Sequence, residues 1–340
     1  MTAVDTALYS RPRAALAFRA ELEPWLFPPA TRARLERAVE LVTTPFTDAD
    51  GGRQAERLRD VEIIIGSWGL PRLDAALLAR MPKLRAVFYG AGTVRGFVTP
   101  AFWARGIALS SAAAANASPT ATFAEAMIVL SLKQTWFYLR NPSVVWPSLG
   151  DTPTSGVHAA VVGIIGLSRV GRGVVAGLQR HELRILAHDP TVSAAEAAQL
   201  GVELVPLSEL FAQSDVVSLH APLLPQTTGM IRGDHLRAMR PHTTFVNTAR
   251  GAIVDEAEMV EVLRARPDLT AVLDVTHPEP TPTDSPLRAL PNVVLTPHLA
   301  GARHREIELM GRLVCDEVER YLAGQPLQWA VTESAAAQQA

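Results

Sequence analysis

Cysteine is nearly absent from this sequence of 340 residues, because Cys315 is the only one. A single thiol can neither close a disulfide within the chain nor build a metal site from several cysteines, and we expect no metal centre. The chain also has no excess of charge of one sign: 32 Lys and Arg residues oppose 34 Asp and Glu residues, which leaves a net charge of −2. Without a basic excess there is little attraction for a polyphosphate, so the composition disfavours nucleic acid as a partner.

Long hydrophobic runs are missing as well. The longest apolar stretch lies around residues 158–167 and is much too short to span a bilayer. The first 18 residues carry Asp5, Arg11 and Arg13 and no continuous apolar segment of the kind that a signal peptide has. We therefore expect a cytoplasmic protein without a membrane partner. Hydrophobic residues make up 48% of the chain and charged residues 19%, a composition that favours buried cores over disorder.

The length predicts two domains, at roughly 100–200 residues per domain. Before about residue 115, short apolar runs alternate with a helical pattern over residues 73–81, which is typical of a parallel sheet. The predicted strands of this region are residues 62–66, 84–89 and 107–110. We leave the residues before 60 unassigned.

From residue 159 onward the alternation of strands and helices is purer and predicts a doubly wound, nucleotide-binding domain. The predicted strands are residues 159–165, 184–188, 216–220, 244–247, 269–275 and 293–296. The predicted helices are residues 170–180, 194–200, 207–213, 234–239 and 256–266.

Two long helices flank this second region. Residues 119–138 form the longest helical pattern, with Ser118 as a plausible N-cap and Pro119 at the first helical position. The proline-rich residues 142–155 are interpreted as a linker. A final helix over residues 302–322 can pack back on the first region. The sequence thus predicts a discontinuous first domain, residues 1–115 with 302–340, and a dinucleotide-binding domain, residues 116–301.

The most informative local segment is a glycine-rich turn within residues 161–171. It places Gly166, Ser168 and Gly171 at the spacing of G-x-G-x-x-G, with serine in the middle position. Such a turn lets backbone N–H groups and a helix N-terminus approach a pyrophosphate. The Cβ atom of Ser168 narrows this approach, whereas its hydroxyl offers a hydrogen bond. Taken alone, a glycine turn between a strand and a helix is often only structural.

An acidic residue follows the turn at the expected distance. Asp189 ends the next predicted strand, 18 residues after Gly171. A carboxylate in this place accepts hydrogen bonds from the hydroxyls of an adenosine ribose and repels a 2′-phosphate. The segment therefore favours a dinucleotide, and NAD rather than NADP. The alternative for Asp189 is a turn former in the pair Asp189-Pro190, which leaves the spacing unexplained.

Charged side chains follow three predicted strands of the second domain. Arg250 and His298 each lie just past a strand, and Asp274 ends a strand with Glu279 beyond it. Ligands of an open parallel sheet bind outside the carboxyl ends of its strands. A guanidinium there can hold a carboxylate, and an imidazole can exchange a proton. Taken singly, these are more often a surface arginine, a loop glutamate and a structural histidine, and only their joint placement indicates catalysis.

Five segments in this order resemble the family of D-isomer-specific 2-hydroxyacid dehydrogenases. The resemblance extends from about residue 60 to residue 323, and the matching segments are residues 163–171, 214–223, 247–251, 274–280 and 296–301. It implies two doubly wound parallel-sheet domains, a flavodoxin-like substrate domain and a Rossmann NAD-binding domain. It also implies an NAD-dependent dehydrogenase that reduces a small 2-keto acid to the D-2-hydroxy acid, of the glyoxylate, hydroxypyruvate or 2-keto acid reductase type, or catalyses the reverse reaction.

The resemblance implies a role for each matching position. His298 would be the acid/base, Glu279 would pair with it, and Arg250 would bind the substrate carboxylate and polarise the keto oxygen. Asp274 would hold the nicotinamide carboxamide, and the loop Gly90-Ala91-Gly92 would bind the substrate carboxylate through backbone N–H groups. The cofactor-binding residues implied are Gly166, Ser168, Arg169, Val170, Gly171, Asp189, Thr248, Ala249, Arg250, Asp274, His298 and Ala300, and the substrate-binding residues are Ala91, Gly92 and Arg250.

This sequence departs from the family pattern at two places. Ser168 replaces the usual middle glycine, and Thr276-His277 stands where an aromatic residue commonly follows Asp-Val. Glu279 argues against formate as substrate, because formate-using members carry glutamine there. We interpret His277 as a loop residue rather than the catalyst.

Substrate identity and assembly are not determined by these motifs. Candidate pocket side chains are Ser67, Trp68, Tyr89, Thr93 and Trp146, and for the aromatic residues Trp68 and Tyr89 plain packing is the favoured alternative. The family suggests a homodimer with Trp136, Phe137 and Trp146 on the dimerising arm, although these can also pack within one chain. The alternatives to a 2-hydroxyacid dehydrogenase are an NADH-sensing, corepressor-like binding protein of the same family and a phosphite dehydrogenase.

Overall fold

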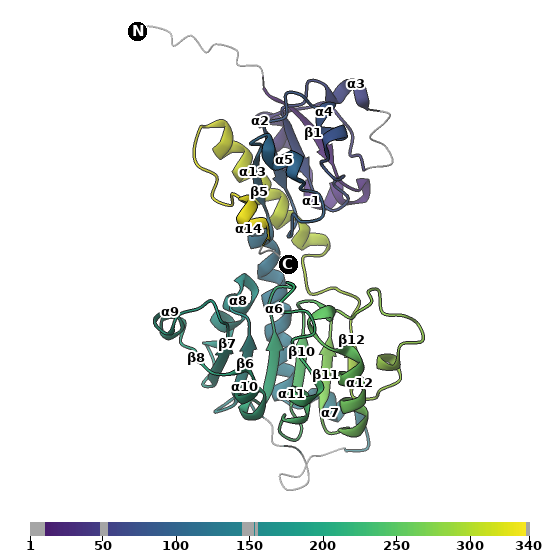
Figure 1. The fold of residues 1–340 in the computed structure, drawn as a ribbon, viewed down its shortest axis with the longest axis vertical. Coiled ribbons are helices and arrows are strands. Elements are labelled where there is room, and N and C mark those ends of the chain that lie inside the picture. The colour runs from purple at the N-terminus through teal and green to yellow at the C-terminus, as the bar shows by residue number, and fades with distance from the viewer. Residues whose placement is uncertain (1–10, 48–53, 145–152, 154–155, 338–340) are drawn as a thin grey trace. The chain divides into compact units, whose positions relative to one another are not determined.

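The chain divides into two compact units in the computed structural model, which describes residues 11–47, 54–144, 153 and 156–337. Unit 1 lies within residues 1–116 and 303–339, and unit 2 comprises residues 117–302. Unit 1 is therefore assembled from two separate segments of the chain. In Figure 1 the strands of unit 1 run from purple to blue and those of unit 2 from teal to green.

Unit 1 contains a five-stranded parallel sheet with the order β2-β1-β3-β4-β5. This is the order of flavodoxin-like domains. Its strands are β1 (Arg13–Ala17), β2 (Glu40–Leu41), β3 (Ile63–Gly66), β4 (Ala86–Tyr89) and β5 (Ala108–Ser111). Its helices are α1 (Glu23–Leu26), α2 (Pro29–Ala38), α3 (Ala55–Leu58), α4 (Ala75–Ala79), α5 (Pro100–Ala104), α13 (Ile307–Leu322) and α14 (Glu333–Ala337).

Unit 2 contains a seven-stranded parallel sheet with the order β12-β11-β10-β9-β6-β7-β8. Its strands are β6 (Val161–Ile165), β7 (Arg184–His188), β8 (Glu203–Leu204), β9 (Val216–Leu219), β10 (Thr244–Asn247), β11 (Thr270–Leu273) and β12 (Val293–Leu295). Its helices are α6 (Ala113–Leu132, which begins in unit 1), α7 (Thr135–Arg140), α8 (Arg169–Leu178), α9 (Ala194–Gln199), α10 (Leu207–Gln213), α11 (Gly233–Arg237) and α12 (Glu256–Ala265).

The strand order of unit 2 reverses between β6 and β9. In chain order the sheet runs 3-2-1-4-5-6 with a seventh strand added, which is the Rossmann arrangement, and ligands of such sheets bind at the point of reversal. Strands β9, β10 and β11 are buried along their whole length, as expected for a parallel sheet covered on both faces. The predicted fold class of two doubly wound parallel-sheet domains is confirmed.

Strand β1 was missed by sequence analysis. Its sequence Arg13-Ala-Ala-Leu-Ala17 has low strand propensity because alanine is depleted in strands. In the structure, residues 14–17 are fully buried between β2 and β3. Burial in the middle of a sheet overrides the weak local preference.

The prediction of one helix over residues 119–138 was wrong. Helix α6 begins at Ala113, contains Pro119 and ends at Leu132, and Gln134 then takes a left-handed conformation (φ 56°) before α7. Four alanines among residues 113–117 are strong helix formers and extend the helix ahead of Pro119. The final helix starts at Ile307 rather than residue 302, after a 3₁₀ turn over His304–Glu306. Most of the predicted linker 142–155 lies outside the described residues.

Candidate active site

Two glycines shape the turn between β6 and α8. Gly166 has φ +88°, and a Cβ atom there would lie 2.6 Å from backbone atoms of Ala221. A Cβ atom on Gly171 would lie 2.1 Å from the carbonyl oxygen of Gly166. Neither position accepts a side chain, so the backbone at the start of α8 stays open to a close ligand.

Ser168 shapes this turn from within. Its hydroxyl donates to the carbonyl oxygen of His220 (2.9 Å) and accepts from the N–H of Gly171 (3.3 Å), so it caps α8. A hydroxyl has one hydrogen to donate. The expectation that Ser168 offers that hydrogen to a pyrophosphate is therefore corrected, because the carbonyl of His220 takes it.

Asp189 lies at the end of β7, directly beside the turn. Its carboxylate accepts from the N–H of Leu167 (2.7 Å) and from both the N–H and the hydroxyl of Thr191 (2.9 and 2.7 Å). Burial alone would raise the pKa of Asp189, but these hydrogen bonds and the charge of Arg172 outweigh burial and lower it. The structure thus holds an ionised carboxylate next to the glycine turn.

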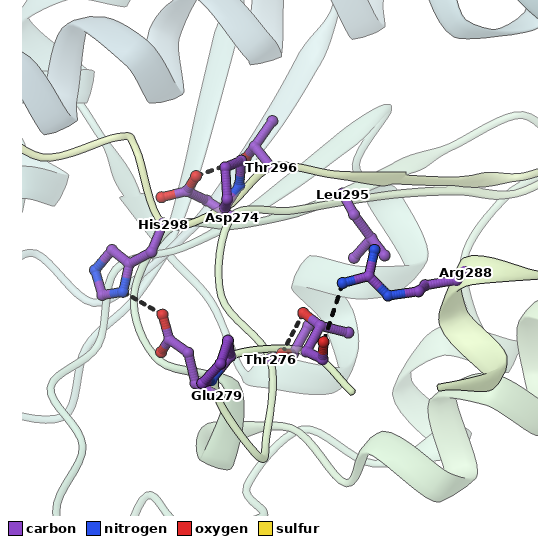
Figure 2. A pocket seen from close by; sticks show the side chains of 10 residues that line it. Asp274, Thr276, Glu279, Arg288, Leu295, Thr296 and His298 are labelled. Carbon is purple, nitrogen blue, oxygen red and sulfur yellow. Dashed lines mark hydrogen bonds and ion pairs between the residues drawn. The ribbon is translucent and has the colours of Figure 1, made fainter. Parts of the chain in front are cut away.

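His298 and Glu279 meet on unit 2. The Nδ1 atom of His298 is hydrogen-bonded to a carboxylate oxygen of Glu279, and Figure 2 shows the two side chains facing each other. About half of the His298 side chain (47%) is exposed. Because Nδ1 is occupied, Nε2 is the ring nitrogen that remains for another partner. Both side chains line a cavity of about 340 Å³, which is also lined by Thr276 and Arg288.

The backbone of His298 is in a conformation that non-glycine residues seldom adopt, with φ +50°. Its N–H donates to the carbonyl oxygen of Asp274 (2.9 Å). The buried carboxylate of Asp274 accepts from the hydroxyl of Thr296 (2.5 Å) and from the N–H groups of Leu299 (2.8 Å) and Ala300 (2.9 Å). Asp274 therefore organises the loop that carries His298, and three of about four acceptor positions of its carboxylate are used.

Arg250 extends from the loop that follows β10. Its guanidinium donates to the carbonyl oxygen of Ala249 (2.7 Å). Burial lowers the pKa of Arg250, and the negative charge of Glu279 acts in the opposite direction, so the two side chains are within electrostatic reach. His298 and Glu279 are thus in contact on unit 2, and Arg250 lies near enough for the charge of Glu279 to act on its pKa.

Asn247 holds the loop before Arg250 and was missed by sequence analysis. Its side chain accepts from the N–H of Ala249 (2.9 Å) and donates to the carbonyl oxygen of Arg250 (3.1 Å). An asparagine side chain often forms a hydrogen bond with the backbone two residues further along the chain. This tendency could have predicted the role of Asn247 from the sequence. The buried hydroxyl of Thr248, in the same loop, has no partner among the described residues.

In unit 1 the loop Gly90-Ala91-Gly92 follows β4. Two of the candidate pocket side chains pack within unit 1, which is the alternative that the sequence analysis favoured for Tyr89. Ser67 is fully buried and donates to the carbonyl oxygen of Gly90 (2.8 Å), and Tyr89 is buried against Phe97 with ring centroids 4.6 Å apart. Burial raises the pKa of the Tyr89 phenol to about 12. Trp68 and Thr93 are half-buried, and Trp146 lies outside the described residues.

The residues of unit 2 fit a dinucleotide. The glycine turn leaves room that a Cβ atom would fill, Asp189 presents an ionised carboxylate beside it, and the unpartnered hydroxyl of Thr248 lies past β10. Arg169 and Val170 occupy the first two positions of α8, where the positive end of the helix dipole favours an anion. Ala300 is buried and its N–H is bound by Asp274, so it supports the site through its backbone.

Comparison with known proteins gives a consistent result. A family model described as "D-isomer specific 2-hydroxyacid dehydrogenase, NAD binding domain" matches residues 131–300. D-3-phosphoglycerate dehydrogenase of Mycobacterium tuberculosis is 35% identical over 256 residues, which are 74% of this chain and 48% of the relative. Glyoxylate reductase of Korarchaeum cryptofilum is 32% identical over 275 residues, 79% of this chain and 82% of the relative.

A solved structure is similar over almost the whole chain. The TT0316 protein of Thermus thermophilus superimposes with a TM-score of 0.74 at 27% identity and covers 94% of this chain and 100% of its own. The chain spans about half the length of the D-3-phosphoglycerate dehydrogenases that it matches. No helix in the described ranges has the length and apolarity that crossing a membrane requires.

Proposed function

The chain belongs to the D-isomer specific 2-hydroxyacid dehydrogenase family, and from this premise we propose that it interconverts a small 2-keto acid and the corresponding D-2-hydroxy acid with NAD. Unit 2 carries the family's NAD-binding domain. The relatives named above act, by their names, on phosphoglycerate and glyoxylate. Both are small carboxylic acids with oxygen on the neighbouring carbon, and this shared chemistry defines the proposed substrate class.

The contact between His298 and Glu279 carries the proposal. Glu279 occupies Nδ1 and leaves Nε2 to face a substrate oxygen. In reduction, the protonated ring gives its Nε2 proton to the oxygen on C2, and in oxidation it takes that proton back. Glu279 fixes the ring and balances its positive charge. General acid–base catalysis of this kind is worth about 10²–10⁴-fold in rate.

Arg250 is the proposed ligand of the substrate carboxylate and of the keto oxygen. A guanidinium binds a carboxylate through two parallel hydrogen bonds. This contact fixes the angle at which the hydride reaches C2 of the substrate. It also stabilises negative charge that develops on the oxygen. Asn247 orients this loop through its two hydrogen bonds to the backbone.

NAD would be held by the start of α8, Asp189, Thr248 and the remaining acceptor position of Asp274. When bound, it supplies or accepts the hydride at C2 of the substrate. Unit 1 would supply substrate-binding groups from the loop Gly90–Gly92, whose backbone N–H groups suit a carboxylate.

We also propose that the protein assembles as a homodimer through α7. Leu139 on this helix is 70% exposed, and Leu130 near the end of α6 is 37% exposed. Trp136 and Phe137 are less available for contact with a second chain, because both already have partners within their own chain. Trp136 donates from Nε1 to the hydroxyl of Ser131 (2.8 Å), and Phe137 packs on Tyr138 and His242.

A spectrophotometric panel tests the proposed activity. Oxidation of NADH at 340 nm is followed with glyoxylate, hydroxypyruvate, pyruvate, 2-ketobutyrate and phenylpyruvate, and the panel is repeated with NADPH. We expect turnover of at least one 2-keto acid with NADH, and slower turnover with NADPH. A chain that binds NADH and oxidises it with none of these acids would refute the proposed activity.

A further inference from the structure

Two buried serines in unit 1 hold the loop that follows β4. The hydroxyl of Ser67, just past β3, donates to the carbonyl oxygen of Gly90 (2.8 Å). The hydroxyl of Ser111, the last residue of β5, lies 2.6 Å from the carbonyl oxygen of Gly92 and 3.1 Å from that of Ala91. Ser67 is fully buried and Ser111 is 3% exposed. Two serines at the ends of β3 and β5, the strands that flank β4, therefore orient three consecutive carbonyl groups of the loop toward the interior of unit 1.

The direction of the carbonyls fixes the direction of the N–H groups. In a planar trans peptide, the C=O of one residue and the N–H of the next point to opposite sides. With the carbonyls of residues 90–92 turned toward the serines, the N–H groups of Ala91, Gly92 and Thr93 point away from them. None of these three N–H groups donates to an acceptor within the described part of the chain. Successive N–H groups of this kind form a concave site for an anion.

We propose that Ser67 and Ser111 are positioning residues that aim the N–H groups of residues 91–93 at the carboxylate of the substrate. This inference rests on the proposed function, because a 2-keto acid supplies the carboxylate. Each serine acts through the loop and touches no substrate itself. Each hydroxyl uses its one hydrogen on the loop. Removing a hydroxyl therefore leaves the loop carbonyl groups near it without this donor.

The kinetic test replaces each serine by alanine and measures the 2-keto acid of the panel that the wild type reduces best. We expect Ser67→Ala to raise KM for the keto acid about 10-fold with little change in kcat, as for the loss of one hydrogen-bonded constraint on binding. The dissociation constant for NADH, measured by fluorescence, should not change. Ser111→Ala should act in the same way, and Ser111→Thr, which keeps the hydroxyl, should restore KM.

A matched control separates positioning from simple loss of packing. Ser214 in unit 2 is also fully buried and donates its hydroxyl to a backbone carbonyl, that of Leu210 (2.7 Å). We expect Ser214→Ala to lower the thermal midpoint without any change in KM. An unchanged KM in folded Ser67→Ala and Ser111→Ala, with only the midpoint lowered, would show a structural role and overturn the proposal.

A second measurement does not depend on the folding of any variant. Sodium oxamate, an unreactive 2-keto acid analogue, is added to the NADH-saturated wild type, and backbone amides are followed by ¹⁵N NMR. We expect the signals of Ala91, Gly92 and Thr93 to shift, while those of Gly96 and Gly106 stay in place. Active enzyme without these shifts would refute the inference and leave the proposed function intact. Wild type that binds NADH and reduces no keto acid would refute the function, and the shifts would still decide whether the loop binds a carboxylate.

Discussion

Single side chains in unit 2 differ in whether the protein already uses their polar atoms. The hydroxyl of Ser168 and most of the carboxylate of Asp274 are engaged in holding loops in place. By contrast, Nε2 of His298 and the buried hydroxyl of Thr248 are left for a partner. We therefore propose that the engaged groups shape the site and that His298 and Thr248 contact its ligands.

The charge of Asp189 should determine the choice between NADH and NADPH. Asp189→Asn keeps one acceptor oxygen, which can serve the N–H of Leu167 or that of Thr191 but not both, and it removes the charge that repels a 2′-phosphate. We expect the ratio of kcat/KM for NADPH to that for NADH to rise about 10-fold, equivalent to about 1.4 kcal/mol. Asp268→Asn, which removes a charge paired with Arg266, is the control. An unchanged ratio would contradict the assignment of Asp189 to the adenosine ribose.

The buried His220 should make stability depend on pH. Burial lowers its pKa to about 3, and its Nε2 atom is bonded to the hydroxyl of Ser218 (2.9 Å). Between about pH 3 and the unfolded value near 6.5, the folded state binds fewer protons than the unfolded state. The stabilising contribution is therefore full above about pH 6.5 and is lost as pH falls toward 3.

Urea unfolding at pH 7.5 and 5.0 measures this effect. We expect His220→Asn to lose less unfolding free energy on acidification than the wild type, by up to about 2 kcal/mol. His158→Gln, at a side chain that is 80% exposed, should follow the wild type. Equal losses in His220→Asn and wild type would show that His220 is protonated in the folded state.

At the scale of loops and strands, the site depends on the close packing of two segments. A Cβ atom on Gly251, just after Arg250, would lie 2.0 Å from the carbonyl carbon of Thr276 and 2.6 Å from the backbone nitrogen of His277. The loop that carries Glu279 therefore lies directly on the loop that carries Arg250. Backbone atoms cannot yield as a flexible side chain can, so any side chain at Gly251 displaces one loop.

Gly251→Ala should consequently impair catalysis as well as stability. We expect kcat/KM to fall about 10²-fold, because displacements of about 1 Å in an active site have this cost, and the unfolding free energy to fall by about 1–3 kcal/mol. Gly96→Ala, at a position with no atom within 4 Å, serves as the matched control in both assays. Wild-type turnover by Gly251→Ala would mean that the contact of these loops does not position the site.

The sequence predicted most elements of unit 2 because apolar strands and turn residues there agree with their environment. Strands β7 and β10 and helix α10 have the predicted bounds. Strand β1 was not predicted, because its alanines adopt a strand only through burial between β2 and β3. The spacing of motifs along the chain could predict which residues form the site. It could not predict the direction in which a serine hydroxyl donates. Hence the roles of Ser67, Ser168 and Asn247 emerged only from the structure.

At the scale of the whole molecule, the chain combines two parallel-sheet units with different strand orders. The family model covers residues 131–300, within unit 2. Unit 1 shows the flavodoxin-like order and carries the proposed carboxylate loop. The proposed cofactor-binding residues thus lie in unit 2, whereas the proposed substrate-binding groups come from both units, the loop of residues 90–92 in unit 1 and Arg250 in unit 2.

The oligomeric state is a property of the whole molecule, and light scattering after gel filtration measures it. We expect a mass about twice that of the 36.6 kDa chain. Leu139→Glu places a charge on the exposed apolar side of α7 and should yield monomers, since charges are depleted in interface cores. Leu322→Glu, at a 39% exposed leucine of unit 1, should remain dimeric. A wild type that elutes as a monomer, or a dimeric Leu139→Glu, would exclude the proposed interface.

The most direct test compares wild type and His298→Asn in one assay of NADH binding and keto acid reduction. Asparagine tolerates the left-handed backbone at this position, so the loop should keep its shape. We expect NADH to bind with unchanged affinity and kcat/KM to fall by about 10²–10⁴-fold. Reduction at nearly the wild-type rate would contradict the assignment of His298, paired with Glu279, as the group that exchanges the proton.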